Sequence, residues 1–192
     1  MTIIKNLNHS LKKSINAKKS LTKQINSINS IICSLEKCVK KGNKMFICGN
    51  GGSAADAQHI AAECLVRLKP NRNRKPIPMI SLALDSSTMT ACANDYSFKN
   101  IFSRNLEGLA KSGDILICIS TSGNSSNIIN VLKTAKKLKI KTVSILGNKG
   151  GKAKKLSDNF IIVDSSNIAS IQEAHIFLGH FLIDELEKKL FD

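Results

Sequence analysis

Hydrophobic residues in the first forty positions recur at helical spacing, with lysine, serine and asparagine between them. The spacing predicts a pair of helices over 3–41 that ends at Gly42. Each helix carries a narrow apolar stripe, which indicates packing on the flank of a domain or on another subunit. The two stripes consist of Ile4, Leu7, Leu11 and Ile15, followed by Leu21, Ile25, Ile28 and Ile32.

After Gly42 the pattern changes to short, continuous apolar runs that alternate with helical segments. Such runs are typical of parallel strands that helices cover on both faces. We therefore predict a single domain over 1–192, with an N-terminal helical segment (1–42) and an α/β core (43–192) built as a three-layer αβα sandwich around a five-stranded parallel sheet. The predicted strands are 45–48, 78–84, 115–119, 142–146 and 160–163, and the main predicted helices are 53–67, 86–93, 98–111, 126–138 and 169–189.

Composition narrows the class of protein further. A chain of 192 residues with 42% hydrophobic residues is large enough to bury a real core. The net charge of +15 comes from dispersed lysines, which indicates a solvated basic surface, although such a surface attracts sugar phosphates or nucleic acid. Six cysteines without a CxxC pair predict reduced, mostly buried thiols of a cytoplasmic protein. Apolar runs are too short for a membrane span, and no signal-peptide pattern is visible.

The stretch MFICGNGGSAADAQHIAAE, residues 45–63, combines an apolar strand, a glycine turn and a helix start. Glycines let the backbone approach an anion, and the unpaired amides of the first helical turn point at it. Ser53 and Asp56 have the spacing of a capping box. His59 and Glu63 are four residues apart, so they share a helix face and could hold a divalent metal. The stretch predicts an anion cradle beside a reaction site.

A second polar loop, Ser120 to Ser125, follows the third predicted strand. Ligands of parallel sheets bind beyond the carboxyl ends of the strands, where this loop and the glycine turn both lie. Clustered hydroxyl and amide groups suit a phosphate, whereas an ordinary serine-rich helix cap is the simpler alternative. Two such loops at one sheet edge favour phosphate binding.

Dinucleotide binding is the weaker interpretation of the glycine turn. Gly49, Gly51 and Ala54 fit a GxGxxA pattern. The acidic residue expected about 20 residues later would fall near Lys69, inside a basic, proline-flanked loop over 69–76. A nucleotide site is therefore disfavoured.

The last predicted helix carries further polar side chains. Gln172 and His180 are eight residues apart, which separates them by about 12 Å along a helix axis. One copy of the helix could hardly bring both to the same small ion. If both serve one site, we expect them to come from different subunits.

Four separated motifs, CGNGGSAADAQHIAAE, ANDYSFKNIFSR, CISTSGNSSNII and IQEAHIFLGHFL, resemble the phosphoheptose (sedoheptulose 7-phosphate) isomerase family of the SIS superfamily. The resemblance covers nearly the whole chain. It implies a flavodoxin-like SIS fold, a cytoplasmic homotetramer and one zinc ion per subunit at sites between subunits. It also implies conversion of sedoheptulose 7-phosphate to D-glycero-D-manno-heptose 7-phosphate, an aldose–ketose isomerisation that opens ADP-heptose synthesis for lipopolysaccharide core. This sequence departs from the usual pattern of the family at 67–72 and at 83–87, and neither stretch includes a motif position.

The resemblance also implies the site residues. The acid–base pair falls on Glu63 and His180. The metal ligands fall on His59, Glu63, Gln172 and His180. Substrate contacts fall on Asn50, Gly51, Gly52, Ser53, Glu63, Asn94, Asp95, Ser120, Thr121, Ser122, Ser125 and Gln172.

In the implied mechanism, Glu63 moves a proton from C1 to C2 through an enediol while His180 moves a proton between the two oxygens. A different class of function is a non-catalytic SIS module that binds the replication initiator DnaA. A relative of that kind lacks the catalytic carboxylate, whereas Glu63 is present here. Another sugar-phosphate isomerase or a sugar-phosphate-sensing regulator would share the loops, but a regulator of that kind usually carries a DNA-binding domain, for which we expect no room in this chain. Nucleic acid and membrane partners are not expected.

Overall fold

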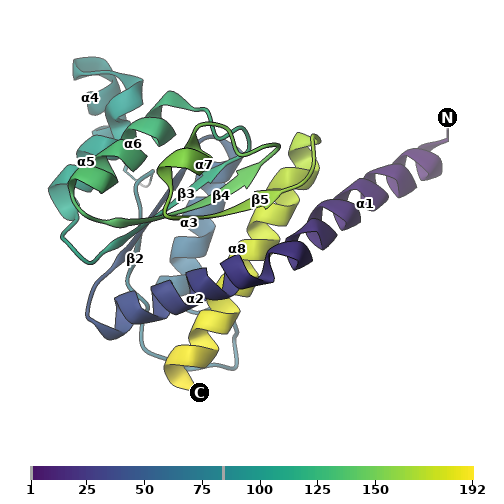
Figure 1. Cartoon of the computed structure of the whole chain (residues 1–192), viewed down its shortest axis with the longest axis horizontal. Coiled ribbons are helices and arrows are strands. Elements are labelled where there is room, and N and C mark those ends of the chain that lie inside the picture. Colours follow the sequence, from purple (N-terminus) through teal and green to yellow (C-terminus); the bar gives the residue numbers. More distant parts are fainter. Residues whose placement is uncertain (1, 84) are drawn as a thin grey trace.

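The computed structural model describes residues 2–83 and 85–192 as an α/β sandwich from which a long N-terminal helix projects (Figure 1). Met1 and Leu84, the last residue of the predicted second strand, lie outside the described residues. The predicted five-stranded parallel sheet is confirmed, and its strand order, β2-β1-β3-β4-β5, is flavodoxin-like. The strands are β1 (Met45–Gly49), β2 (Met79–Ser81), β3 (Ile115–Ser120), β4 (Lys141–Gly147) and β5 (Asn159–Val163).

The strand order places a topological switch point between β1 and β3. The chain leaves β1 toward β2 on one side and resumes at β3 on the other, so the connections after β1 and β3 diverge. Their carboxyl ends stay level, because Cys48 pairs with Cys118 and Gly49 pairs with Ile119. A crevice at this point is where such sheets bind ligands.

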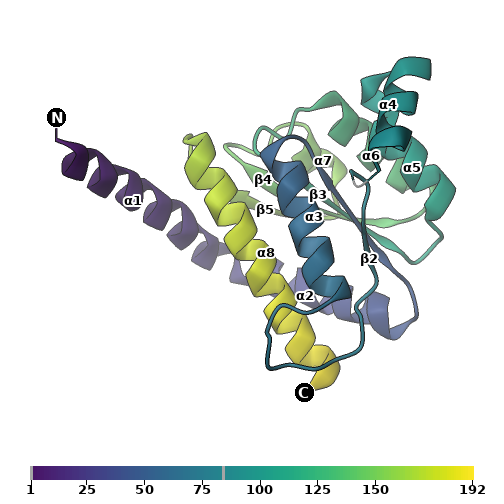
Figure 2. The same cartoon turned by 180° about the vertical axis from the view of Figure 1, so that it is seen from behind.

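Alternate strand residues face two separate cores, one on each side of the sheet. Ile47 and Ile117 face the first core, with the helices α2 and α3 and the C-terminal helix α8. Phe46 and Leu116 face the second, with the remaining helices of the α/β core, and the two views show the same layers (Figures 1 and 2). The helices are α2 (Ile25–Lys40), α3 (Gly52–Leu65), α8 (Ile168–Phe191), α4 (Ser86–Asp95), α5 (Ile101–Leu109), α6 (Ser126–Lys137) and α7 (Ala153–Leu156).

The N-terminal segment forms the predicted helical pair, α1 (Ile3–Lys19) and α2, joined by a 3-10 turn, η1 (Ser20–Gln24). Gln24 fastens this turn to β5, because its side chain donates to the carbonyl of Ile162 and accepts from its amide. The second apolar stripe is largely buried on the sheet, whereas the first is exposed: Leu7 and Leu11 are 56% and 50% exposed. Among the described residues, α1 contacts α8, with Ser14 and Ala17 buried, whereas residues 3–13 are exposed.

Other predicted elements are present with adjusted bounds. The second strand is short, and the predicted helix over 98–111 divides into a 3-10 turn, η2 (Phe98–Asn100), and α5. All six cysteines are free and five are buried, as expected. None of the helices in 2–83 and 85–192 combines the length and apolar character of a membrane span.

Candidate active site

The glycine turn after β1 is held in an unusually tight shape. A side chain at Gly49 would lie 2.4 Å from the carbonyl oxygen of Ser53, and Gly51 has a φ of 57°, a left-handed conformation that glycine adopts readily. Helix α3 begins directly afterwards at Gly52, so the start of the helix lies at the carboxyl edge of the sheet. The predicted capping box is wrong: Gly51 is the cap residue, and Ser53 lies inside the helix without capping it.

The serine-rich loop lies at the neighbouring strand end. Ser120 is buried, and its hydroxyl accepts a hydrogen bond from the amide of Gly123. This bond folds the loop back on itself. Ser125 precedes α6 without capping it through its side chain. A helix start with several hydroxyl groups beside it is suited to bind a phosphate.

Side chains connect these two loops across the switch point. Asn50 and Asn127, which is buried at the start of α6, exchange hydrogen bonds of 2.8 and 2.7 Å. The two loops thus belong to one rigid edge.

Three of the predicted metal-ligating and catalytic residues meet farther along α3, where this helix packs on α8. The Nε2 atom of His59 lies 3.1 Å from both His180 Nε2 and Glu63 Oε1, and His180 Nε2 lies 3.5 Å from Glu63 Oε1. All three belong to the same chain. Glu63 and His180 approach each other within one chain because α3 and α8 pack side by side (Figure 2).

Close packing of α3 on α8 brings the two imidazoles together. Gly179 lies against Ile60, where an added side chain would approach the Ile60 Cδ1 atom to 2.4 Å. His180 and His59 are the sequence neighbours of these two contact residues. A glycine at this crossing lets the helix axes approach closely, and the next residues then meet ring to ring with centroids 5.3 Å apart.

The donor set fits a divalent metal ion. Two imidazole nitrogens and one carboxylate oxygen lie within 4.8 Å of one another. They form the two-histidine, one-glutamate set of many zinc sites that leave a further position open. Glu63 Oε2 is buried and lacks a hydrogen-bond partner within 2–83 and 85–192.

One turn earlier on α3, Asp56 adds a further carboxylate close to the cluster. Burial raises the pKa of Asp56, and the nearby charges of His59 and His180 act against this increase. Its Oδ2 atom also lacks a hydrogen-bond partner in the described part of the chain. The site therefore contains a second carboxylate beside that of Glu63.

The remaining predicted residues lie apart from this cluster. Gln172 lies against Gly52, so it faces the glycine turn, about two helical turns from His180. Asn94 and Asp95 are exposed at the end of α4, where Asn94 donates to Asp95 at 2.9 Å. Among the described residues, no hydrogen bond joins this pair to the cluster.

Sequence reasoning missed several residues that shape the site. Asn127 lies inside the CISTSGNSSNII motif, but no role was assigned to it, because a lone asparagine in a helix is common. Gly179 could have been noticed as a helix glycine next to a candidate histidine. The side chain of Arg74, in the basic loop over 69–76 to which no role was assigned, is almost fully buried and donates to the carbonyl of Glu63.

Comparison with known proteins agrees with this geometry. Residues 10–147, more than half of the chain, match the family model of the SIS domain. The fold, the switch-point crevice and the two loops are thus those of a SIS-domain protein.

The relatives narrow this class. A phosphoheptose isomerase of Clostridium acetobutylicum is 46% identical over 184 residues, which are 94% of this chain and 93% of the relative. A phosphoheptose isomerase of Sulfurimonas denitrificans is 45% identical and covers 97% of this chain and 96% of its own length. The structure of a phosphoheptose isomerase from Francisella tularensis superposes with a TM-score of 0.92 at 33% identity, covering 98% of this chain and all of its own. The chain belongs to the phosphoheptose isomerase family, a family of aldose–ketose isomerases.

Proposed function

We propose that this protein converts sedoheptulose 7-phosphate to D-glycero-D-manno-heptose 7-phosphate, the step that opens ADP-heptose synthesis for lipopolysaccharide core. The observation that carries the proposal is the approach of Glu63 to His180 at 3.5 Å. Glu63 lies on the helix that begins at the glycine turn, about 16 Å along its axis from Gly52. An acid–base pair next to a phosphate site is what a sugar-phosphate isomerase requires.

The phosphate end of the substrate is assigned to the serine-rich loop. Ser120, Thr121, Ser122 and Ser125 surround the start of α6, and the α3 start with Asn50 to Ser53 lies across the switch point. Binding energy from the phosphate would hold the reacting carbons in place, so that remote contacts contribute to the rate. Asn94, Asp95 and Gln172 are proposed to contact the sugar hydroxyls.

Glu63 is proposed to remove the C1 proton and return it to C2. Its Oε1 faces the two imidazoles, whereas the buried Oε2 has no partner in the described chain and can act as the base. His180 would move a proton between the C1 and C2 oxygens of the enediol. A positioned acid or base contributes about 10²- to 10⁴-fold to such a step.

The metal proposed here is zinc, one per subunit, held by His59, Glu63 and His180. When bound, it would polarise the substrate oxygens and stabilise the negative charge that develops on them. Gln172 of the same chain lies about two helical turns away from His180. The fourth protein ligand, if Gln172 supplies it, would come from a neighbouring subunit.

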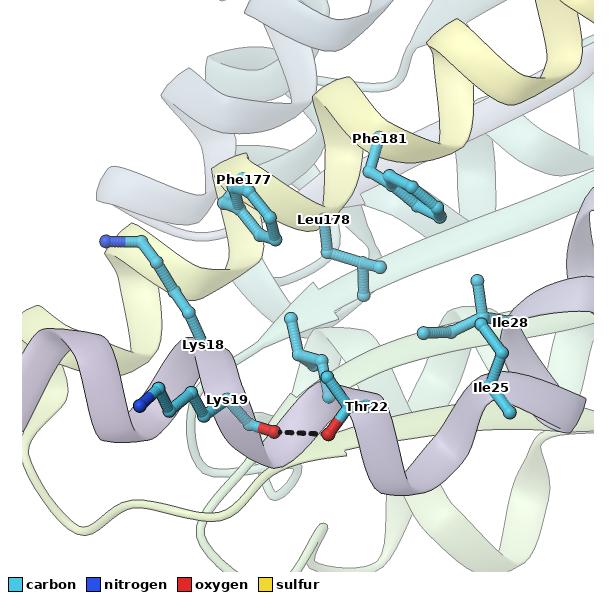
Figure 3. Close-up of a pocket in the computed structure, with 9 residues that line it drawn as sticks. Lys18, Lys19, Thr22, Ile25, Ile28, Phe177, Leu178 and Phe181 are labelled. Atoms are coloured by element: carbon cyan, nitrogen blue, oxygen red, sulfur yellow. Dashed lines mark hydrogen bonds between the residues drawn. The ribbon is translucent and has the colours of Figure 1, made fainter.

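A homotetramer is proposed from the apolar surface that a single chain leaves uncovered. The exposed stripe of α1 continues into a groove of about 320 Å³ between η1, α2 and α8, with Phe177 and Phe181 on its rim (Figure 3). Both phenylalanines come from the helix that carries Gln172 and His180. We propose that further copies of the chain cover this surface, because α1 is a long amphipathic helix that packs little on its own chain.

Six free thiols agree with a cytoplasmic location.

The direct test is to incubate the purified protein with sedoheptulose 7-phosphate and to follow the aldose product, with and without a chelator. Product formation that the chelator abolishes and Zn²⁺ restores is the expected result. Absence of the aldose product with zinc-loaded protein would rule out the proposed activity. Product formation that the chelator does not change would rule out the metal.

A further inference from the structure

Arg74 and Glu187 form a buried ion pair on the side of the site away from the phosphate loops. Their side chains are 1% and 0% exposed, and Arg74 Nε and Nη2 lie 2.7 and 2.6 Å from Glu187 Oε1. Arg74 belongs to the basic loop between α3 and β2, and Glu187 belongs to α8. Burying two charges requires a desolvation penalty that their attraction offsets incompletely, so such a pair is weak evidence for stability alone.

The same guanidinium also binds the end of the helix that carries the proposed base. Arg74 Nη2 donates to the carbonyl of Glu63 at 2.7 Å, and Nη1 donates to the carbonyl of Cys64 at 2.8 Å. Carbonyls in the last turn of a helix lack partners inside the helix, and a cation there also matches the helix dipole. Arg74 therefore caps α3 at the residue whose carboxylate enters the site.

Glu187 connects this cap to the helix that carries the proposed acid. It lies seven residues after His180 on α8, which is two turns, so both side chains project from one face. Glu187 Oε1 also accepts the amide of Leu68 at 3.4 Å, just beyond the end of α3. The contact chain thus runs from the Glu63 backbone through Arg74 to Glu187 and along α8 to His180.

We infer that Arg74 and Glu187 are positioning residues that fix α3 against α8 and so set the separation between Glu63 and His180. This inference rests on the proposed function of those two side chains. A misplacement of about 1 Å between reacting groups can reduce a rate by about 10²-fold, so a tether at this place affects turnover more than substrate binding.

The test replaces both partners together, because removing one would leave an uncompensated buried charge. The Arg74→Met/Glu187→Leu variant removes both charges of the pair and the contacts of Arg74 to Glu63 and Cys64. Arg72, whose Nε lies 4.0 Å from Glu187 Oε2, retains its pair with Asp192. We expect kcat per folded molecule to fall about 10- to 100-fold while KM changes less than about threefold. Amide hydrogen exchange over 62–66, measured by mass spectrometry without substrate, is expected to accelerate.

Lys69→Gln is the matched control, because Lys69 pairs with Asp184 and so joins the same loop to α8 without touching α3 carbonyls. It should leave kcat and the exchange at 62–66 unchanged. If the double variant does not fold, Arg74→Lys replaces it in the test. This substitution keeps the positive charge but loses the several N–H donors of the guanidinium, so kcat should also fall at constant KM. A folded variant with wild-type kcat or wild-type exchange would overturn the inference. If the wild-type protein shows no turnover, the proposed function and the catalytic part of the inference are overturned. The exchange data would then still show whether Arg74 and Glu187 fix the end of α3.

Discussion

Asn50 and Asn127 exchange two side-chain hydrogen bonds across the switch point of the sheet. Asn127 Oδ1 also accepts the amide of Ile128 at 2.9 Å, so the buried amide side chain is oriented by its own helix. The pair joins the turn after β1 to the helix after β3. It therefore sets the spacing between the two loops that we propose to hold the sugar and its phosphate.

Replacing Asn127 with alanine should weaken substrate binding and stability together. Asn50 would lose its partner, and the buried polar groups left behind reduce the free energy of unfolding by about 1–3 kcal/mol. KM should rise several-fold while kcat changes less, because the acid–base pair is untouched. Steady-state kinetics and urea unfolding test this.

The matched control for this variant is Asn130→Ala on the same helix. Asn130 donates to Asn100 and Ser103 instead of to the switch-point loop. This control should lose a comparable amount of stability at constant KM. An unchanged KM in Asn127→Ala would contradict the assignment.

Glu63→Gln should retain the fold and lose turnover. The amide keeps the shape of the side chain but cannot accept the C1 proton, so kcat should fall at least about 10²-fold. Glu36→Gln, at an exposed ion pair of α2, should be indistinguishable from wild type. Near-wild-type turnover in Glu63→Gln would rule out its role as the base.

Stability should decrease in weak acid because of His175, which is buried on α8. Burial lowers the pKa of His175 from 6.5 to about 4, and the carbonyl of Leu146 opposes this shift only partly. Between these two values the unfolded chain binds a proton that the folded chain does not, so stability present above pH 6.5 is lost as the pH falls toward 4. The loss between pH 7.5 and pH 5 amounts to about 2 kcal/mol.

Urea unfolding at a series of pH values measures this loss. His175→Leu should show a flatter profile over the same interval, because it removes the titrating group. Wild type and variant with the same slope would contradict the assignment to His175.

The exposed stripe of α1 should hold the assembly together. Leu7→Lys/Leu11→Lys places two charges in the stripe, and light scattering should show a smaller particle than the proposed tetramer. Lys13→Gln changes the same helix off the stripe and should leave the mass unchanged. A tetramer that survives the double substitution would exclude α1 from the interface.

Much of the fold could be predicted from local pattern. The run at 115–119 is apolar over its length, and the run at 142–146 is interrupted only by Thr142 and Ser144. Such runs are typical of strands buried on both faces, and β3 and β4 lie there. Element bounds were less certain, because short-range contacts decide them. The helix that was predicted to begin at Ser53 begins at Gly52, because the tight glycine turn ends at Gly51 and the next residue is already helical.

The candidate site also has one part that local spacing predicted and another that it did not. Spacing within one helix was sufficient to pair His59 with Glu63. Spacing along α8 also separated Gln172 from His180, as the structure does, but it could not tell which chain supplies His180. That question depends on how closely α3 and α8 pack, which the contact of Gly179 with Ile60 determines.

By itself, the sequence determined the elements, their order and the loops at the strand ends, because backbone periodicity and glycine turns are local properties. Tertiary structure alone decided which side chains of different helices and loops meet. The approach of His180 to Glu63, the bridge from Asn50 to Asn127 and the burial of Arg74 against Glu187 all join residues 77 to 117 positions apart. Such contacts follow from the packing of helices on a sheet, and no local pattern of residues encodes them.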